Sequence, residues 1–163
     1  MAFISKKIED LINFRIQQEE LSSRLYLAMS KWLMFNGYAG ASKLWKKYSD
    51  EEASHAGWGY EYLEELDILP MVPALEKPQC EFKGLVDICK ASYDHEMLVT
   101  KQCNELATAA AQENDYMTLQ LAQKYLKEQV EEIGKTTYWL DRIEAFGTSP
   151  ESLRLLDDEM GNA

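Results

Sequence analysis

Four glutamates lie on or beside the apolar face of a segment with helical periodicity, where a core residue is expected. They are Glu19, Glu52, Glu96 and Glu132. A carboxylate is almost never fully buried unless it is paired, and four carboxylates that meet inside one helical bundle repel one another. The sequence therefore predicts that cations hold these four side chains.

Two of the glutamates have a partner on the same helical face. Residues three apart share a helical face, so Glu52 and His55 can bind one metal. Gln129 and Glu132 are also three apart and can contribute to one site in the same way. Four carboxylates carry four negative charges, which two divalent cations would neutralise. Carboxylates with an imidazole suit iron or manganese better than zinc, which favours nitrogen and sulfur.

Each of these residues also has an ordinary explanation. A single glutamate on such a face is more often a surface residue, and a lone histidine more often forms a hydrogen bond. Tyr26, two turns after Glu19 on the same face, fits a core residue as well as a redox partner of a metal. The metal site is favoured because four such side chains coincide at comparable depth.

Four long segments with helical periodicity position these side chains. Their expected ranges are 6–35, 41–66, 83–111 and, after a capping pair at Asn114 and Asp115, a last segment up to 146. The mean spacing of their apolar residues, near three and a half, is typical of four-helix packing. On the last segment the predicted buried seam, with Glu132 beside it, is Leu119, Ala122, Leu126, Gln129, Ile133, Thr136, Leu140 and Ile143.

The connection between the second and third segments, residues 67–82, is different because Pro70, Pro73 and Pro78 exclude helix. About 15 extended residues span about 50 Å, whereas a helix of about 28 residues is about 42 Å long. The connection can therefore run the length of the bundle and leave the two segments parallel. We predict an all-α fold, a four-helix bundle with one long crossover.

A short fifth helix is predicted at about 150–160. Ser149 supplies an N-cap and Pro150 takes the first helical position. A helix of this length is not stable alone, so it must dock on the bundle or on a neighbouring molecule. We expect one domain over residues 1–163, with the bundle at about 6–146.

The composition indicates what the chain binds and where it works. Its 163 residues carry 28 acids against 17 bases, a net charge of -11 that disfavours nucleic acid and anionic membranes and attracts cations. The same charge is also compatible with nothing more than solubility. Cys80, Cys89 and Cys103 form no C-x-x-C pair, which argues against a disulfide framework and a zinc site. The N-terminus turns charged at Lys6, too early for a secretory signal. No apolar run approaches the ~20 residues that a membrane span needs. We expect a reduced, cytoplasmic protein.

Over essentially its whole length the sequence resembles a bacterial-type non-haem ferritin. The matching motifs are EELSSRLY at 19–26, DEEASH at 50–55, HE at 95–96 and EQVEE at 128–132. The resemblance implies a ferritin-like fold that contains a ferroxidase centre.

The resemblance assigns ligands to two irons in each subunit. Glu19, Glu52 and His55 hold the first iron. Glu52 bridges to a second iron, which Glu96 and Glu132 complete.

It also implies roles for residues around the centre. Gln129 lies beside it as a hydrogen-bonding or oxygen-site residue, and Tyr26 lies beside the first ligand. A third iron site in this family maps onto Glu51, Glu128 and Glu131, although glutamates on exposed turns of a helix need no special explanation.

Two departures narrow the subtype. Haem-binding bacterioferritins carry a methionine after the glutamate of the second helix and E-x-x-H on the fourth, whereas this chain has Ala53 and Gln129-Val130-Glu131-Glu132, which argues against haem. Animal heavy chains lack the second acid that Glu132 supplies. DNA-protecting mini-ferritins have a different second-helix pattern, and rubrerythrins add a C-x-x-C domain that this sequence lacks.

The function implied by the resemblance is iron storage. Fe(II) is oxidised by oxygen or hydrogen peroxide, and the ferric mineral is kept inside a shell of about 24 copies. Two alternatives stay open: a di-iron peroxidase or oxidase that forms small oligomers, and a structural helical bundle without metal.

Overall fold

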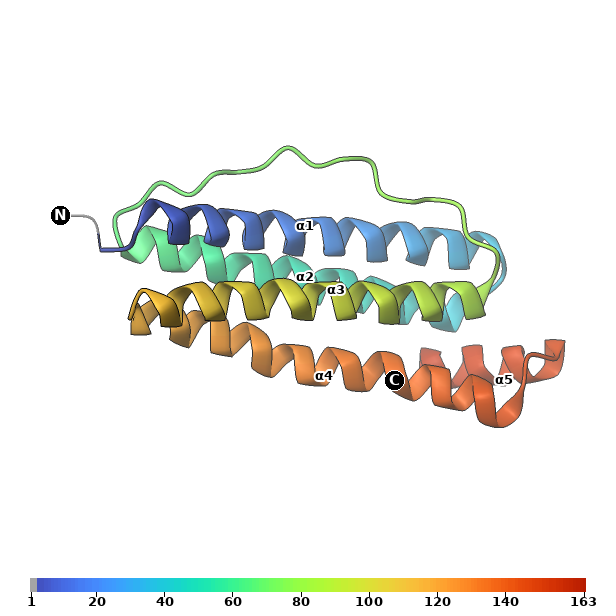
Figure 1. Cartoon of the computed structure of the whole chain (residues 1–163). Helices are drawn as coiled ribbons and strands as arrows, with labels where there is room; N and C mark the ends of the chain where they lie inside the picture. The colour runs from blue at the N-terminus through green and yellow to red at the C-terminus, as the bar shows by residue number, and fades with distance from the viewer. Residues whose placement is uncertain (1–2) are drawn as a thin grey trace.

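The computed structural model describes residues 3–163, and this range contains five helices and no strand (Figure 1). The helices are α1 (Lys6–Phe35), α2 (Ala39–Glu65), α3 (Leu85–Gln112), α4 (Tyr116–Phe146) and α5 (Pro150–Gly161). Their bounds lie within two residues of those predicted from the sequence. The all-α prediction is confirmed.

The helices begin and end where the local sequence requires. Ser5 and Asp115 cap α1 and α4 by accepting hydrogen bonds from backbone N–H groups three residues later, at 3.2 and 3.0 Å. After α1, Gly37 adopts φ +87, a conformation that side-chain-bearing residues rarely take. Ser149 caps α5 and Pro150 is its first residue, as predicted.

The predicted long crossover is present. Figure 1 shows the segment between α2 and α3 running along α1 from one end of the bundle to the other, so that α2 and α3 are parallel. Two hydrogen bonds attach it to α1: the Met71 backbone N–H donates to Asn13 Oδ1 at 2.8 Å, and Gln17 Nε2 donates to the Ala74 carbonyl at 3.3 Å.

The apolar core is divided into two clusters that leave the middle of the bundle to polar side chains. The N-terminal cluster includes Ile4, Ile8, Ile12, Ile16, Leu63, Val99, Leu106, Leu121 and Tyr125. The α5-end cluster includes Tyr26, Met29, Leu33, Leu44, Trp45, Tyr48, Leu85, Ile88, Trp139, Leu156 and Met160. On every bundle helix at least one buried polar residue lies in sequence between the residues of the two clusters. The buried polar side chains therefore lie between two apolar ends.

The predicted buried seam of α4 was partly wrong. The buried residues are Thr118, Leu121, Ala122, Tyr125, Gln129, Glu132, Thr136 and Trp139. The predicted aliphatic residues at 119, 126, 133, 140 and 143 are half-buried at the edge of the stripe. Tyr125 and Trp139 take their place because their rings reach the core and their polar atoms are bonded, to the His55 carbonyl at 2.8 Å and the Tyr48 hydroxyl at 3.1 Å. Glu132 therefore lies on the seam and not beside it.

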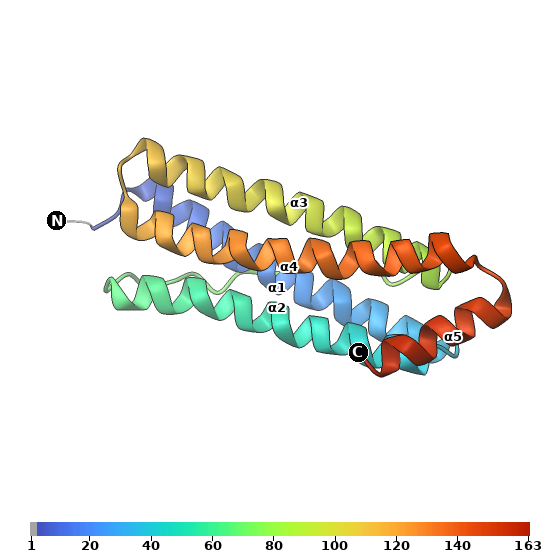
Figure 2. The same cartoon turned by 90° about the horizontal axis from the view of Figure 1, so that it is seen from below.

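Helix α5 docks on the bundle itself, over the start of α2 (Figure 2). The two backbones approach so closely that a Cβ on Gly40 would lie 1.9 Å from the Asp157 carbonyl oxygen. The Asp157 side chain accepts a hydrogen bond from the Ala41 backbone N–H at 2.7 Å, which satisfies a free donor in the first turn of α2. Leu156 and Met160 enter the α5-end cluster.

Within residues 3–163 no helix combines the length and the apolar character that crossing a membrane requires.

Candidate metal centre

The polar middle of the bundle contains the residues that the sequence singled out. Glu19 from α1, Glu52 and His55 from α2, Glu96 from α3 and Glu132 from α4 are all buried, with exposures of 1 to 6%. All four bundle helices thus contribute to one site. The predicted convergence at comparable depth is what the structure shows.

The ligand atoms form three overlapping groups, and the two groups made only of buried residues share Glu52. An oxygen or nitrogen of each of Glu19, Glu52 and His55 lies within 4.8 Å of the others, and the same holds for Glu52, Glu96 and Glu132. Each of these two groups can surround one metal ion, with Glu52 between them. The third group joins His55 and Glu132 to the half-buried Glu128. The donors are oxygen and imidazole nitrogen without sulfur, a set that suits iron or manganese.

Two cations of the protein itself, which the sequence analysis missed, partly compensate the buried negative charge. Arg15 Nε lies 2.8 Å from Glu19 Oε1, and its side chain is only 2% exposed. Lys135 Nζ lies 2.8 Å from Glu132 Oε1. The protein's own side chains therefore supply part of the positive charge that the sequence was expected to draw from bound cations. The spacings of four and three residues could have suggested both pairs.

Glu52 and Glu96 have no such cation among the described ion pairs. Glu96 accepts hydrogen bonds from the Tyr26 hydroxyl and from Gln129 Nε2, the latter at 3.0 Å. Burial raises the pKa of Glu96, and these hydrogen bonds oppose the rise. The pKa of Glu52 is raised well above its usual value by burial and by the adjacent Glu19. A bound cation would therefore stabilise the ionised form of Glu52.

Glu132 is intermediate between these cases. Burial raises the pKa of its carboxyl to about 7, against the lowering effect of the Lys135 ammonium. Near neutral pH this carboxyl is partly protonated, so a cation that binds to it displaces a proton.

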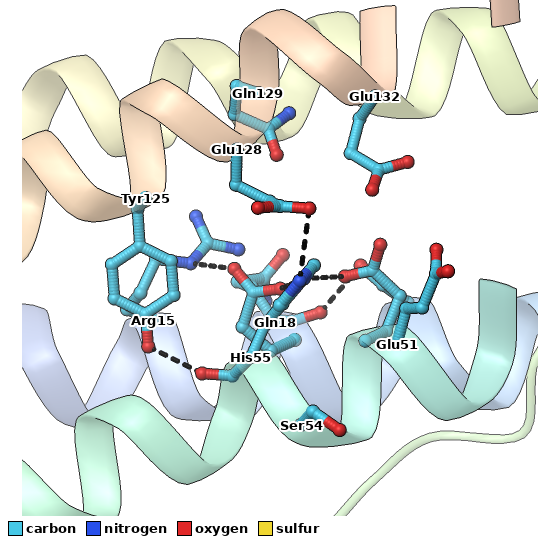
Figure 3. Close-up of polar contacts among 12 residues, drawn as sticks. Arg15, Gln18, Glu51, Ser54, His55, Tyr125, Glu128, Gln129 and Glu132 are labelled. Atoms are coloured by element: carbon cyan, nitrogen blue, oxygen red, sulfur yellow. Dashed lines mark hydrogen bonds and ion pairs between the residues drawn. The ribbon is translucent and has the colours of Figure 1, made fainter. Parts of the chain in front are cut away.

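His55 is held in position for metal binding (Figure 3). Its Nδ1 lies 3.4 Å from Glu52 and 3.8 Å from Glu19. Its ring packs against Trp58 with centroids 4.7 Å apart, and the Tyr125 hydroxyl donates to its backbone carbonyl at 2.8 Å. Burial lowers the pKa of His55, which favours the neutral imidazole that metals bind.

The three acids predicted for a third iron lie in different surroundings. Glu128 Oε1 lies 3.5 Å from His55 Nε2, and Glu128 forms a group with His55 and Glu132. Glu51 accepts a hydrogen bond from Lys135 at 2.9 Å. Glu131 is exposed and belongs to none of the ligand groups found among residues 3–163. The structure does not bring these three acids together.

Tyr26 is both a core residue and a neighbour of the site. It is 2% exposed within the α5-end cluster, and its hydroxyl donates to Glu96. Its ring makes edge contacts with Tyr48 and with His95, at centroid distances of 6.2 and 5.8 Å. His95 Nε2 lies 2.7 Å from Ser22 Oγ, and burial lowers the pKa of His95 to about 4. It is therefore a neutral hydrogen-bonding residue that supports the wall of the centre.

Comparisons with known proteins agree with this geometry. The family described as Ferritin-like domain matches residues 9–146. The chain is 33% identical over 159 residues to a probable bacterial non-heme ferritin-like protein of Haemophilus influenzae, covering 98% of this chain and 96% of that one. It is 33% identical over 149 residues to a bacterial non-heme ferritin of Escherichia coli, covering 91 and 90% of the two chains.

A solved structure is similar over the whole fold. The novel open pore ferritin from Archaeoglobus fulgidus superposes with a TM-score of 0.96 at 31% identity, over 100% of this chain and 99% of that one. The predicted resemblance to bacterial-type non-haem ferritins is confirmed. The chain belongs to the ferritin family.

Proposed function

We propose that this protein oxidises Fe(II) at the centre in the middle of the bundle and stores the ferric product inside a shell of its own copies. The observation that carries the proposal is the position of Glu52. This buried carboxylate is the member that the two fully buried ligand groups share, and it lacks a lysine or arginine partner among the described ion pairs. Two bound iron ions would supply the charge that it lacks.

Iron is the substrate here. Glu19, Glu52 and His55 would bind one Fe(II), and Glu96 and Glu132 would complete the site of the second. Each iron gives up one electron, so the pair reduces one oxygen molecule, with two protons, to hydrogen peroxide. Hydrogen peroxide as the oxidant would take the same two electrons and two protons and yield two water molecules. The carboxylate ligands are hard donors that favour Fe(III) over Fe(II) and so assist the oxidation.

The protein prepares this reaction through burial and charge. The five ligand side chains are buried between the two apolar clusters, and this burial strengthens the electrostatic interactions among them. The neutral imidazole of His55 and the partly protonated carboxyl of Glu132 allow metal binding near neutral pH. Gln129 and Tyr26 fix the orientation of Glu96 by hydrogen bonding.

Storage in a shell is supported by the relatives. The similar proteins carry the names bacterial non-heme ferritin and open pore ferritin, and they align along nearly the whole chain. The sequence resemblance implies a closed assembly of about 24 copies. We place the protein in the cytoplasm, which the free thiols of Cys80, Cys89 and Cys103 support.

The test combines an oxidation assay with a measurement of size. Fe(II) is added in air to the metal-free protein, ferric absorbance is followed with time, and the product is separated by gel filtration. We expect rapid oxidation and iron that elutes with a large assembly. Oxidation no faster than in buffer would contradict the ferroxidase function. Rapid oxidation by a small oligomer that retains no mineral would instead identify a di-iron peroxidase or oxidase.

A further inference from the structure

We propose that Lys135 is a built-in cation that occupies the place of a third metal and limits this centre to two metal ions. The inference rests on the proposed function, because it assumes that the centre binds metal. It concerns the side of the centre formed by α2 and α4, where acids for a third site were predicted.

The ammonium group joins two carboxylates from different helices. Lys135 Nζ lies 2.9 Å from Glu51 Oε2 on α2 and 2.8 Å from Glu132 Oε1 on α4. Both distances are those of charge-assisted hydrogen bonds. A cation bound to Glu51 and Glu132 would have to take the same position, so the ammonium and a metal ion compete for it.

The neighbouring ring of Tyr48 helps to hold the lysine in this position. Lys135 Nζ lies 5.5 Å from the centroid of the Tyr48 ring, within the range of a cation–π interaction. Tyr48 is fixed in turn because its hydroxyl accepts a hydrogen bond from Trp139 Nε1 at 3.1 Å. The lysine side chain is 31% exposed, so solvent does not fully screen its interaction with the nearly buried Glu132.

The position of the Lys135 ammonium group is accessible to metal ions from solvent. Lys135, Tyr48 and Trp139 line an open hollow of about 620 Å³, so ions can reach the ammonium from solvent. A third metal is opposed by the positive charge of Lys135 and by the ion pair that already occupies the Glu51 carboxylate. Without the lysine, Glu51 and Glu132 would be free to bind a cation, with Glu128 the next acid on the same side of α4.

The test counts Zn(II) ions, which bind without being oxidised. Metal-free protein is titrated by isothermal calorimetry, and the bound zinc is then measured after gel filtration. Lys135→Met removes the charge and keeps the length of the side chain, and Lys135→Gln is a second neutral variant. Lys135→Arg keeps the charge. Lys127→Met is the matched control, because it removes a positive charge from an exposed position of the same helix.

We expect two tightly bound Zn(II) per chain in the unchanged protein, in Lys135→Arg and in Lys127→Met. Both neutral variants at position 135 should bind three. Adding Glu51→Gln to Lys135→Met should return the count to two, because the gained ion needs that carboxylate. Gel filtration and circular dichroism establish that each variant is assembled and helical.

Two results would overturn the inference alone: three tight ions in the unchanged protein, or two in both neutral variants. A gained ion that persists after Glu51→Gln would place it elsewhere and also overturn the inference. If the unchanged protein binds no zinc tightly, the proposed metal centre itself is contradicted.

Discussion

The ends and the middle of the bundle are built by the same four helices but by opposite chemistry. At the N-terminal end Ile8, Ile12 and Ile16 are fully buried among other apolar residues. In the middle the equally buried Glu19 and Glu52 face other carboxylates. Burying an apolar side chain stabilises a fold by about 1.5–3 kcal/mol, whereas a buried carboxylate without a partner destabilises it. The ends therefore provide the stability that allows the middle to hold charge.

We therefore expect substitutions in the middle to change the rate of Fe(II) oxidation, and substitutions at the ends to change the free energy of unfolding. The largest effect is expected for Glu52→Ala, because Glu52 is the member that the two fully buried ligand groups share. Fe(II) oxidation in air should fall to the rate in buffer while assembly persists. Glu105→Ala, at an exposed position of α3, is the matched control and should leave the initial rate unchanged. An unchanged rate in Glu52→Ala would contradict the assignment of the site.

Removal of residues 150–163 deletes helix α5, which packs on the α5-end cluster. The deletion takes away Leu156 and Met160 from the α5-end cluster and the Asp157 cap of α2. We expect a less stable shell that loses mineral, with no change in the first oxidation step. Gel filtration and iron retained after dialysis measure the former, and stopped-flow absorbance measures the latter. Full iron retention by the shortened chain would show that α5 has no part in storage.

Ile12→Ala probes the opposite end. A fully buried isoleucine replaced by alanine leaves a cavity, so the free energy of unfolding should fall by about 2–5 kcal/mol. Thermal unfolding of the metal-free protein measures this loss, with the exposed Glu105→Ala as the reference. The rate of Fe(II) oxidation at a temperature where both variants are folded should be equal. A large loss of rate in Ile12→Ala would break the distinction between ends and middle.

The smallest expected effect is the release of protons from the middle when metal binds. The raised pKa of Glu132, about 7, means that this carboxyl is largely protonated at pH 6 in the metal-free protein and largely ionised at pH 8. The pKa of Glu52 is also raised well above its usual value, by burial and by the adjacent Glu19, so this carboxyl can add to the protons released. Zn(II) binding at pH 6 should release about one to two protons, and fewer at pH 8.

Calorimetry in buffers with different enthalpies of ionisation measures this number. Glu132→Gln should release fewer protons at pH 6 than the unchanged protein. Equal binding enthalpies in all buffers at pH 6 would show that the carboxyls are already ionised before metal arrives.

The fold was predictable because its signals are local. Gly37, Asp115 and Ser149 mark helix ends by their own backbone and capping chemistry, and the prolines of residues 67–82 exclude helix wherever they occur. The α4 seam was less predictable. The spacing of its aliphatic residues predicted a seam that left out Tyr125 and Trp139. The burial of these two rings depends on hydrogen-bond partners in α2 that the sequence of α4 does not reveal.

The same limit applies to the candidate centre. The E-x-x-H spacing of Glu52 and His55 is visible in the sequence, and so is the coincidence of four glutamates. The spacings of Arg15 from Glu19 and of Lys135 from Glu132 were visible too, but the burial of these pairs was not, because a basic residue three or four positions from an acid usually pairs with it in solvent. Whether such a pair turns inward depends on the packing of the other helices.

The central claim is that the middle of the bundle holds two metal ions that share Glu52. Crystals soaked anaerobically in Fe(II), with anomalous diffraction measured at the iron edge, test it most directly. We expect two peaks in each chain, one among Glu19, Glu52 and His55 and the other among Glu52, Glu96 and Glu132. A centre without iron, or peaks to which Glu52 contributes no ligand, would contradict it.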